Sequence, residues 1–479
     1  MQNSRRKMMN IKKYWSLWII IALTPIFIWA TILILPTFDD WTSLISPSFE
    51  PLISKERFLF YGYHWRPFDS IFGWIVGRNP HLLFPTLNHI CVVIGHVACT
   101  MVVYWLITIL KFNDIARNIA TLYFFITPSM LATTLAVDGL NQTYANLWGM
   151  MALVIYLTMK GSKKYMLWIT MVAIATLCKE NGLMWILISP IFAFGFDFID
   201  TKRLKRDLMI GSGIIFIYAL LIVSLPSNIE IHPEYVPSVT KIIKDIFKFL
   251  LTTFICVDFV SLLHEPSRNW MIAIITLLLS IPFFYCIFIR KIKLFQNKEI
   301  ISLILCLLIA VAPHIFTVYS MMHTYAGLEI VAVMIAYVIN SYDKTTFLKW
   351  AFLSFLVSAI FIDIHLWKES VRSGLIGKEM AQEIIKKTGS PVNSAYFIVI
   401  DDNYPKLSSF CVIPSEAVGW GIAAQYENNY QWPEMIRDTL IERQINAEQI
   451  AEEIALRKIN NKQFDCAWII NHKKVKVIR

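Results

Sequence analysis

Long apolar runs separated by short polar segments fill the chain up to residue 364. A membrane core about 30 Å thick needs roughly 20 apolar residues in a helix, and Trp15–Leu35 has that length directly after a group of basic residues. Pro36 follows this run where a signal peptide would have small residues and a cleavage site, so we expect the helix to be retained with its amino end in the cytoplasm. Together with ten later runs, the pattern predicts eleven transmembrane helices. The later runs lie near residues 86–110, 118–136, 143–159, 165–178, 182–196, 208–225, 270–289, 299–318, 322–341 and 347–364.

The composition agrees with an integral membrane protein. Of the 479 residues, 56% are hydrophobic and 16% are charged, and the mean hydropathy is +0.55, whereas soluble proteins carry about 25% charged residues. The net charge is 44 − 34 = +10, but the basic residues lie in short clusters between apolar runs, where they set orientation. No basic stripe interleaved with aromatic residues is present, so we expect no nucleic-acid partner. Soluble enzymes, disordered chains, collagens and disulfide scaffolds are excluded as classes.

The Lys and Arg residues predict which loops face the cytoplasm. Two long segments, 37–85 and 226–269, then lie outside, and each has an amphipathic stretch that we expect on the membrane face, Glu56–Val76 and Lys241–Leu263. The odd number of helices leaves residues 365–479 outside as well. The predicted cytoplasmic loops contain Lys111, Arg117, Lys160, Lys163, Lys164, Lys202, Arg203, Lys205, Arg206, Arg290, Lys291, Lys293, Lys344 and Lys349.

Residues 365–479 have the pattern of a small α/β domain, long enough for its own core. We therefore expect an all-α transmembrane domain over 1–364 and an extracytoplasmic α/β domain over 365–479. Of the eight cysteines, Cys411 and Cys466 lie in this tail, where they could form a disulfide. The predicted elements of the tail are strands Ala395–Ile400 and Phe410–Ile413, helix Glu434–Arg457, and strands Cys466–Ile470 and Val475–Ile478.

Two charged pairs are candidates for chemistry. Asp39 and Asp40 follow the first helix, where carboxylates can deprotonate an acceptor hydroxyl or hold a divalent cation. Lys179 and Glu180 follow an apolar run, Tyr165–Cys178, that reaches only about 21 Å as a helix, so they must lie below the membrane surface. A charge at that depth usually faces a polar cavity or a partner. Ordinary helix-end charges remain the alternative for both pairs.

Three weaker features accompany these pairs. Segment 63–67, Tyr-His-Trp-Arg-Pro, contains Arg66, whose planar fork suits a phosphate; an interfacial aromatic belt is the alternative. His89 and His96 lie seven residues apart, on one helix face about 10.5 Å apart, so they would line one wall of a cavity unless they are simply buried. His323 and Tyr325 lie in a predicted outer turn, where they could bind a phosphate or a sugar hydroxyl. All these features fall on the predicted outer side, which favours one outward-facing site.

The order of these features resembles the GT-C superfamily of membrane glycosyltransferases, in particular its O-mannosyltransferase-type branch and related bacterial enzymes. The likeness covers roughly residues 15–190, and the tetratricopeptide tail of some members is absent. The matching elements are Phe38-Asp39-Asp40-Trp41, Trp65-Arg66-Pro67, His89 with His96, Thr127-Pro128, and Lys179-Glu180. The departures from the family pattern are Val92 for an asparagine, Thr127 for a histidine, and His323-Thr324-Tyr325 where Arg-Tyr is common.

The resemblance implies transfer of a hexose or pentose from a polyprenyl-phosphate donor to a protein, lipid or glycan acceptor, with inversion. By family position Asp39 is the general base, and Asp40 orients it or helps to hold a divalent cation such as Mg²⁺ or Mn²⁺. Arg66 and Lys179 neutralise the donor phosphate, and Glu180 holds Lys179 in place. No metal is required, because two fixed cations can suffice. The further substrate-binding candidates are His89, His96, His323 and Tyr325.

Two other classes stay open at this stage. A polytopic transporter or lipid flippase would have Lys179 and Glu180 in its pathway, although no duplication relates residues 15–225 to 270–364 as inverted repeats would. A scaffold whose tail binds partners is the third class. The Ile- and Lys-rich composition is typical of a bacterium and favours the inner (plasma) membrane; the endoplasmic reticulum is the alternative.

Overall fold

The computed structural model describes residues 13–36, 66–68, 85–224, 238–255, 274–275, 277–283, 285, 297–316, 321–341, 345–389, 392, 394–400, 434–438, 446–471 and 474–479. Asp39, Asp40, Cys411 and the predicted strand Phe410–Ile413 lie outside these residues, as does most of the predicted amphipathic stretch Glu56–Val76.

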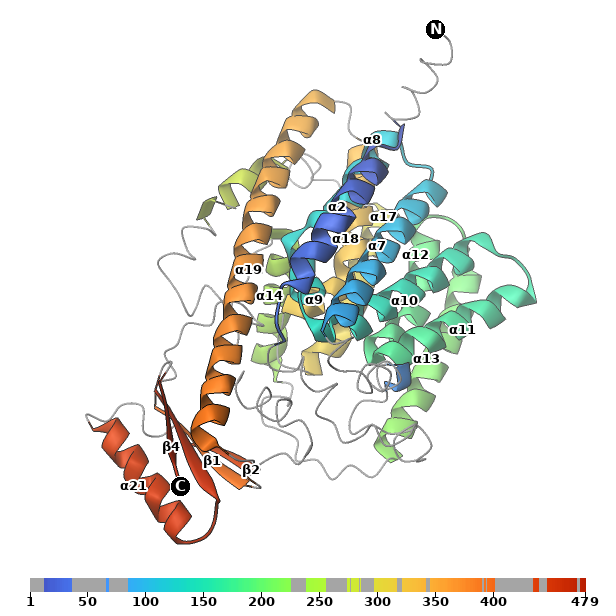
Figure 1. Ribbon diagram of the computed structural model, residues 1–479. Helices are drawn as coiled ribbons and strands as arrows, with labels where there is room; N and C mark the ends of the chain where they lie inside the picture. The colour runs from blue at the N-terminus through green and yellow to red at the C-terminus, as the bar shows by residue number, and fades with distance from the viewer. Residues whose placement is uncertain are drawn as a thin grey trace.

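The described chain up to residue 388 is helical, and its helices pack side by side as a bundle (Figure 1). The longer helices are α2 (Trp15–Ile32), α7 (Thr86–Ile109), α8 (Asp114–Ile126), α10 (Leu140–Thr158), α11 (Ser162–Cys178), α12 (Trp185–Gly195), α13 (Thr201–Ser224), α14 (Val239–Ile255), α17 (Lys298–Val311), α18 (Leu328–Asn340) and α19 (Thr345–Thr388). The short ones are η3 (Pro128–Met130), α9 (Leu131–Thr134), η4 (Val137–Gly139), η5 (Glu180–Met184), η9 (Ala312–Phe316) and η10 (Met321–Gly327).

Four described helical segments are long and apolar enough to cross a membrane: Trp15–Ile32, Thr86–Ile109, Met321–Asn340 and Thr346–Thr388. This confirms a mostly helical chain with the character of a membrane protein, while the count of eleven spans stays a prediction. Several predicted runs are interrupted helices. The run 118–136 ends as α8 at Ile126, because Thr127 is extended before Pro128, a residue whose ring disfavours helix in its predecessor.

The bundle has two ends, which we name after the residues that flank α2. At the Lys13 end, Asn118 Nδ2 donates to the carbonyl of Lys13 at 3.0 Å, and Asn340 Oδ1 accepts from the Asn113 amide at 2.8 Å. At the Pro36 end, α2 and α11 finish while α7 and α10 begin. The described residues next to the predicted outer loops 37–85 and 137–142 lie at the Pro36 end.

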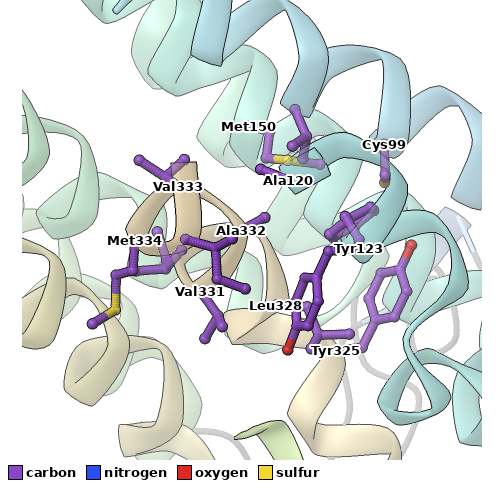
Figure 2. Close-up of a cluster of buried hydrophobic side chains, with 14 of the residues drawn as sticks. Cys99, Ala120, Tyr123, Met150, Tyr325, Leu328, Val331, Ala332, Val333 and Met334 are labelled. Atoms are coloured by element: carbon purple, nitrogen blue, oxygen red, sulfur yellow. The ribbon is translucent and has the colours of Figure 1, made fainter. Parts of the chain in front are cut away.

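The centre of the bundle is formed by α18 and the helices around it. Figure 2 shows side chains of α18, including Leu328 and Val331, packed against Tyr123 of α8 and Met150 of α10. Every residue of α18 from Leu328 to Ala336 is buried. The segment η10, which precedes α18, is therefore anchored on a fully packed helix at the Pro36 end.

Helix α19 joins the bundle to the C-terminal domain without a break. The sequence predicts a membrane run that stops at residue 364, but the helix continues to Thr388, a total of 44 residues or about 66 Å. Trp367 Nε1 donates to the carbonyl of Ala30 in α2 at 2.8 Å, and Gly374 lies so close to Leu35 that a Cβ there would be 2.8 Å from it. Beyond Gly374 the helix passes the Pro36 end and reaches the C-terminal sheet (Figure 1).

The C-terminal domain is a four-stranded sheet between two helices, with strand order β2-β1-β3-β4. Strands β1, β2 and β3 are parallel and β4 is antiparallel to β3. Ile376, Met380 and Ile384 of α19 cover one face, while α21 covers the other through Ala451 and Ala455. The elements are β1 (Ser394–Val399), β2 (Glu434–Asp438), α21 (Ala447–Asn460), β3 (Cys466–Asn471) and β4 (Lys474–Ile478).

The sequence predictions for this domain are correct for three strands and wrong at the start of one helix. The strands at 395–400, 466–470 and 475–478 are confirmed as β1, β3 and β4. The helix predicted over Glu434–Arg457 begins only at Ala447, because residues 434–438 pair with β1 from Ser394↔Glu434 to Ile398↔Asp438. Backbone pairing in the sheet outweighs the weak helical preference of these few residues.

Cys466 is a free, fully buried thiol on β3. Burial raises the pKa of this thiol to about 11. The positive charge of Arg479 lowers the pKa, but its effect is smaller than that of burial. At pH 8 roughly one thiol in a thousand would be ionised, and only the thiolate reacts. We expect native Cys466 to resist N-ethylmaleimide at pH 8 and to react quickly after unfolding, as measured by mass-spectrometric mapping. Fast labelling of Cys466 in the folded protein would contradict this packing.

Candidate functional site

An ion pair between Arg66 and Glu180 connects two motifs that are 114 residues apart in the sequence. Arg66 Nε donates to both carboxylate oxygens, at 3.0 and 3.2 Å, and Nη2 donates to Oε2 at 3.0 Å. The side chains are 18% and 27% exposed, so the pair is shielded from much of the solvent screening that weakens surface pairs. This two-pronged geometry is the strongest arrangement available to Arg and a carboxylate. The structure shows Glu180 bound to Arg66, a contact that the sequence does not predict; the predicted role of Glu180 in holding Lys179 stays a prediction.

The turn after α11 places Lys179 in the protein interior and leaves Glu180 partly exposed. Lys179 is extended and ends the helix, and η5 begins at Glu180. Gly182 lets this turn fold back onto α11, because a Cβ at that position would be 2.3 Å from the backbone carbon of Ala175. Gly182 N also donates to the Lys179 carbonyl at 2.9 Å. The Lys179 residue is consequently only 8% exposed, while its depth in a membrane stays a prediction.

Two histidines complete this group. The rings of His314 in η9 and His323 in η10 are stacked, with centroids 4.2 Å apart and an angle of 17° between the planes. Lys179 interacts electrostatically with both rings, and its Nζ lies 4.0 Å from the sulfur of Met322. Arg66 interacts electrostatically with His323. We call the five residues Arg66, Lys179, Glu180, His314 and His323 the basic cluster; with neutral histidines its formal charge is +1.

Hydrogen bonds to neighbouring segments fix η10 and so position His323. They connect η10 to η3, α9, α10 and α7, which surround it at the Pro36 end. Because each uses a backbone or buried side-chain group, η10 has little freedom to move within the bundle. The bonds are Thr324 Oγ1 to Ser129 O at 3.1 Å, Thr133 Oγ1 to Met322 O at 3.2 Å, Asn146 Nδ2 to Tyr325 O at 2.7 Å, and Tyr325 Oη with His96 Nδ1 at 2.9 Å.

The structure does not bring every predicted residue to the basic cluster. His96 is fully buried and stacks on Phe124 and Phe125. Its Nε2 lies 3.1 Å from the Phe125 carbonyl, and since a carbonyl only accepts, this nitrogen donates while Nδ1 of the neutral ring accepts from Tyr325. His96 and Tyr325 therefore bind each other in the core. The described contacts of His96 and Tyr325 support η10. They do not join either residue to Arg66 or Lys179 of the basic cluster.

His89 has a different structural position from His96. It is fully buried, and its Nε2 donates to the carbonyl of Ile34 at 3.0 Å. This bond fixes the chain just after α2, five residues before Asp39 in the sequence. His89 thus anchors the base of the segment that contains the predicted catalytic aspartates, which themselves lie outside the described residues.

No group of three or more His, Cys, Asp or Glu side chains within the described ranges could hold a metal ion. The metal ligands predicted from the sequence are Asp39 and Asp40, which those ranges leave out. A divalent cation at these aspartates therefore stays a prediction.

Several buried polar atoms without a hydrogen-bond partner among the described residues lie at the Pro36 end, and others, such as Tyr104 Oη and Arg117 Nε, lie at the Lys13 end. Native proteins leave few such atoms, and they commonly mark a place for water or a ligand. Those near the starts of α7 and α10 and in η5 and η10 are Asn88 Oδ1, His89 Nδ1, both amide atoms of Gln142, Asn181 Oδ1 and His323 Nδ1. Their position next to the basic cluster favours a polar ligand at this end.

Sequence reasoning missed His314 and Glu329. Each is a titratable residue inside an otherwise apolar run, and that isolation was the available signal. Glu329 is fully buried in α18, where Oε2 accepts from Asn146 Nδ2 at 3.2 Å. Because Asn146 also holds the Tyr325 carbonyl, Glu329 contributes to the support of η10.

The Arg66–Glu180 pair can be tested by a double-mutant cycle on thermal unfolding in detergent micelles, with Arg66→Ala, Glu180→Ala and the double variant. Because both partners are mostly buried and the geometry is two-pronged, we expect a coupling energy of about 1–2 kcal/mol. The matched control is the exposed pair of Lys298 and Asp197, 2.6 Å apart with side chains 39% and 78% exposed, for which about 0.5 kcal/mol or less is expected. Equal, small couplings in both cycles would show that Arg66 and Glu180 do not form this contact.

The net charge of the basic cluster suits an anion. Arg66 and Glu180 offset each other in charge, so Lys179 gives the basic cluster its net positive charge, and a phosphate would complement it. The unpartnered amide and imidazole atoms nearby could donate to, or accept from, hydroxyl groups of the same ligand. No protein-family model matches the chain, and no curated protein matches it.

Proposed function

We propose that this chain is a membrane glycosyltransferase that moves a sugar from a polyprenyl-phosphate-linked donor to an acceptor. The observation that carries the proposal is the basic cluster, in which Arg66, Lys179 and His323 meet at the Pro36 end of the bundle. Two elements of the ordered pattern that resembles the GT-C superfamily lie at this end, the Arg-Pro element and the Lys-Glu element, as do residues 33–36, which precede the Asp39-Asp40 element in the sequence. The first two are in contact through Arg66 and Glu180.

The charge of the basic cluster suits the leaving group of this reaction. A polyprenyl-phosphate-linked sugar is a phosphodiester with one negative charge, and the polyprenyl phosphate that leaves carries up to two. Fixed cations placed where negative charge develops stabilise the transition state more than the ground state. Lys179 would neutralise the additional charge, and Glu180 would keep the guanidinium of Arg66 oriented toward the phosphate.

In this proposal Asp39 supplies the base. Its carboxylate takes the proton of the acceptor hydroxyl, the acceptor oxygen attacks the anomeric carbon, and the bond from that carbon to the phosphate oxygen breaks. One displacement of this kind inverts the configuration. The bond between His89 and the Ile34 carbonyl supports the role of Asp39, because it holds the preceding segment at the end of the bundle where the basic cluster lies.

We further propose that the Pro36 end faces away from the cytoplasm. The Lys13 end has several basic residues, among them Lys111, Lys163, Lys202 and Lys349, as expected of cytoplasmic loops. The C-terminal domain extends from the Pro36 end through α19, so it would stand beside the site, where it could contact the acceptor or a partner protein. On this reading the chain spans the bacterial inner membrane about eleven times.

The test is release of polyprenyl phosphate from polyprenyl-phosphate-linked hexose and pentose donors by the full chain in lipid nanodiscs, measured by mass spectrometry. Wild-type protein should release the lipid phosphate, and Asp39→Asn should lower the rate by at least about 100-fold, the usual effect of losing a general base. Arg66→Gln and Lys179→Gln should also lower the rate.

The matched control for this assay is Asp197→Asn, the same change at an exposed position of the Lys13 end, which should leave the rate unchanged. Full activity of the Asp39→Asn variant would remove the proposed base. Movement of intact donor across a vesicle membrane without sugar transfer would instead favour a lipid carrier.

A further inference from the structure

A second charged group lies at the Lys13 end of the bundle, where α10, α11 and α13 meet. Its centre is Asp207, which is completely buried. The carboxylate accepts from the hydroxyls of Tyr156 and Tyr165, and from Arg206 Nε at 2.9 Å. Arg203 Nε lies 4.0 Å from it. These contacts hold two arginines and two tyrosines in a fixed arrangement.

This group contains more positive charge than Asp207 can offset. Lys164 is 2% exposed, and its Nζ lies 3.4 Å from the ring centroid of Tyr156. With Arg203 and Arg206 it makes three cations around one carboxylate, a net charge of +2. Lys160, Lys163, Lys202 and Lys205 surround the group on the exposed surface. Like charges held this close repel unless an anion joins them, so the group is suited to bind one.

An exposed apolar stripe lies on α13 directly after Arg206. Arg206, whose side chain is 56% exposed, is followed at helical spacing by Met209, Phe216 and Leu220, which are 75%, 64% and 53% exposed. Gly213 lies on the same face, and a Cβ there would have nothing within 4 Å. Residues three and four apart share one face of a helix, so the stripe runs about 21 Å along α13 from Arg206 to Leu220.

We infer that this surface binds an anionic phospholipid, with the headgroup phosphate on Arg203 and Arg206, additional positive charge from the buried Lys164, and an acyl chain along the α13 stripe. A free phosphate would use only the cations, whereas a phospholipid would use the cations together with the adjacent apolar stripe. A zwitterionic lipid would fit the stripe but would not supply net negative charge. The length of the stripe exceeds half of a membrane core of about 30 Å, which is what one leaflet presents. This site lies at the opposite end from the basic cluster and does not depend on the proposed transferase activity.

The experiment uses the full chain, delipidated in detergent and titrated with dioleoylphosphatidylglycerol or dioleoylphosphatidylcholine, with bound lipid counted by native mass spectrometry. Wild-type protein should retain phosphatidylglycerol more tightly than phosphatidylcholine. Arg206→Gln should weaken phosphatidylglycerol binding about fivefold, which corresponds to roughly 1 kcal/mol for one basic residue at a membrane surface. Phosphatidylcholine binding should change little.

Two further variants test the contributions of the α13 cations and of the α13 stripe separately. Lys111→Gln/Lys349→Gln removes charge at the same end but away from α13 and should leave phosphatidylglycerol binding unchanged; an equal loss would show a general charge effect and overturn the site. Phe216→Ser/Leu220→Ser leaves every contact of Asp207 intact and should also weaken lipid binding, even if Arg206→Gln fails to fold. Full competition by millimolar inorganic phosphate, or equal retention of the two lipids, would overturn the inference as well.

Discussion

The ion pair between Arg66 and Glu180 is the contact on which the candidate site depends. A charged side chain recessed in an apolar bundle is costly unless it meets a partner, and these two residues meet in a two-pronged geometry. The pair places the Arg-Pro element next to the turn that follows α11. With that turn fixed, Lys179 lies beside Met322 and interacts with the histidines of η9 and η10. The ion pair therefore fixes the position of Lys179, which gives the basic cluster its net positive charge.

The surroundings of the pair act as a rigid frame. The central helix α18 is buried along most of its length, and η10 is bonded to its neighbours through Thr324, Tyr325 and the Met322 carbonyl. His96, which looks like a ligand in the sequence, belongs to this frame through its contact with Tyr325. Helix α19 packs on α2 and continues into the C-terminal sheet. One helix thus connects the membrane part with the domain that we propose to stand beside the acceptor.

Hydrophobic periodicity was enough to predict the mostly helical part of the chain and three C-terminal strands. Each of these follows from segment length or alternation within a few neighbouring residues. The partner of Glu180 and the role of His96 could not be predicted, since both depend on contacts between residues more than 100 positions apart. The helix predicted at Glu434 failed for the same reason, because pairing with β1 makes that segment a strand. His314 was missed because its isolation in an apolar run does not show which residues it meets in the folded chain.

The most direct measurement is a cryo-electron-microscopy structure of the full chain in a lipid nanodisc with polyprenyl phosphate bound. The account predicts the lipid phosphate at the Pro36 end, within hydrogen-bonding distance of Arg66 and Lys179, about 3 Å between donor and acceptor atoms. It also predicts Glu180 on the guanidinium of Arg66. A phosphate bound at another place, beyond the reach of both cations, would contradict the central claim.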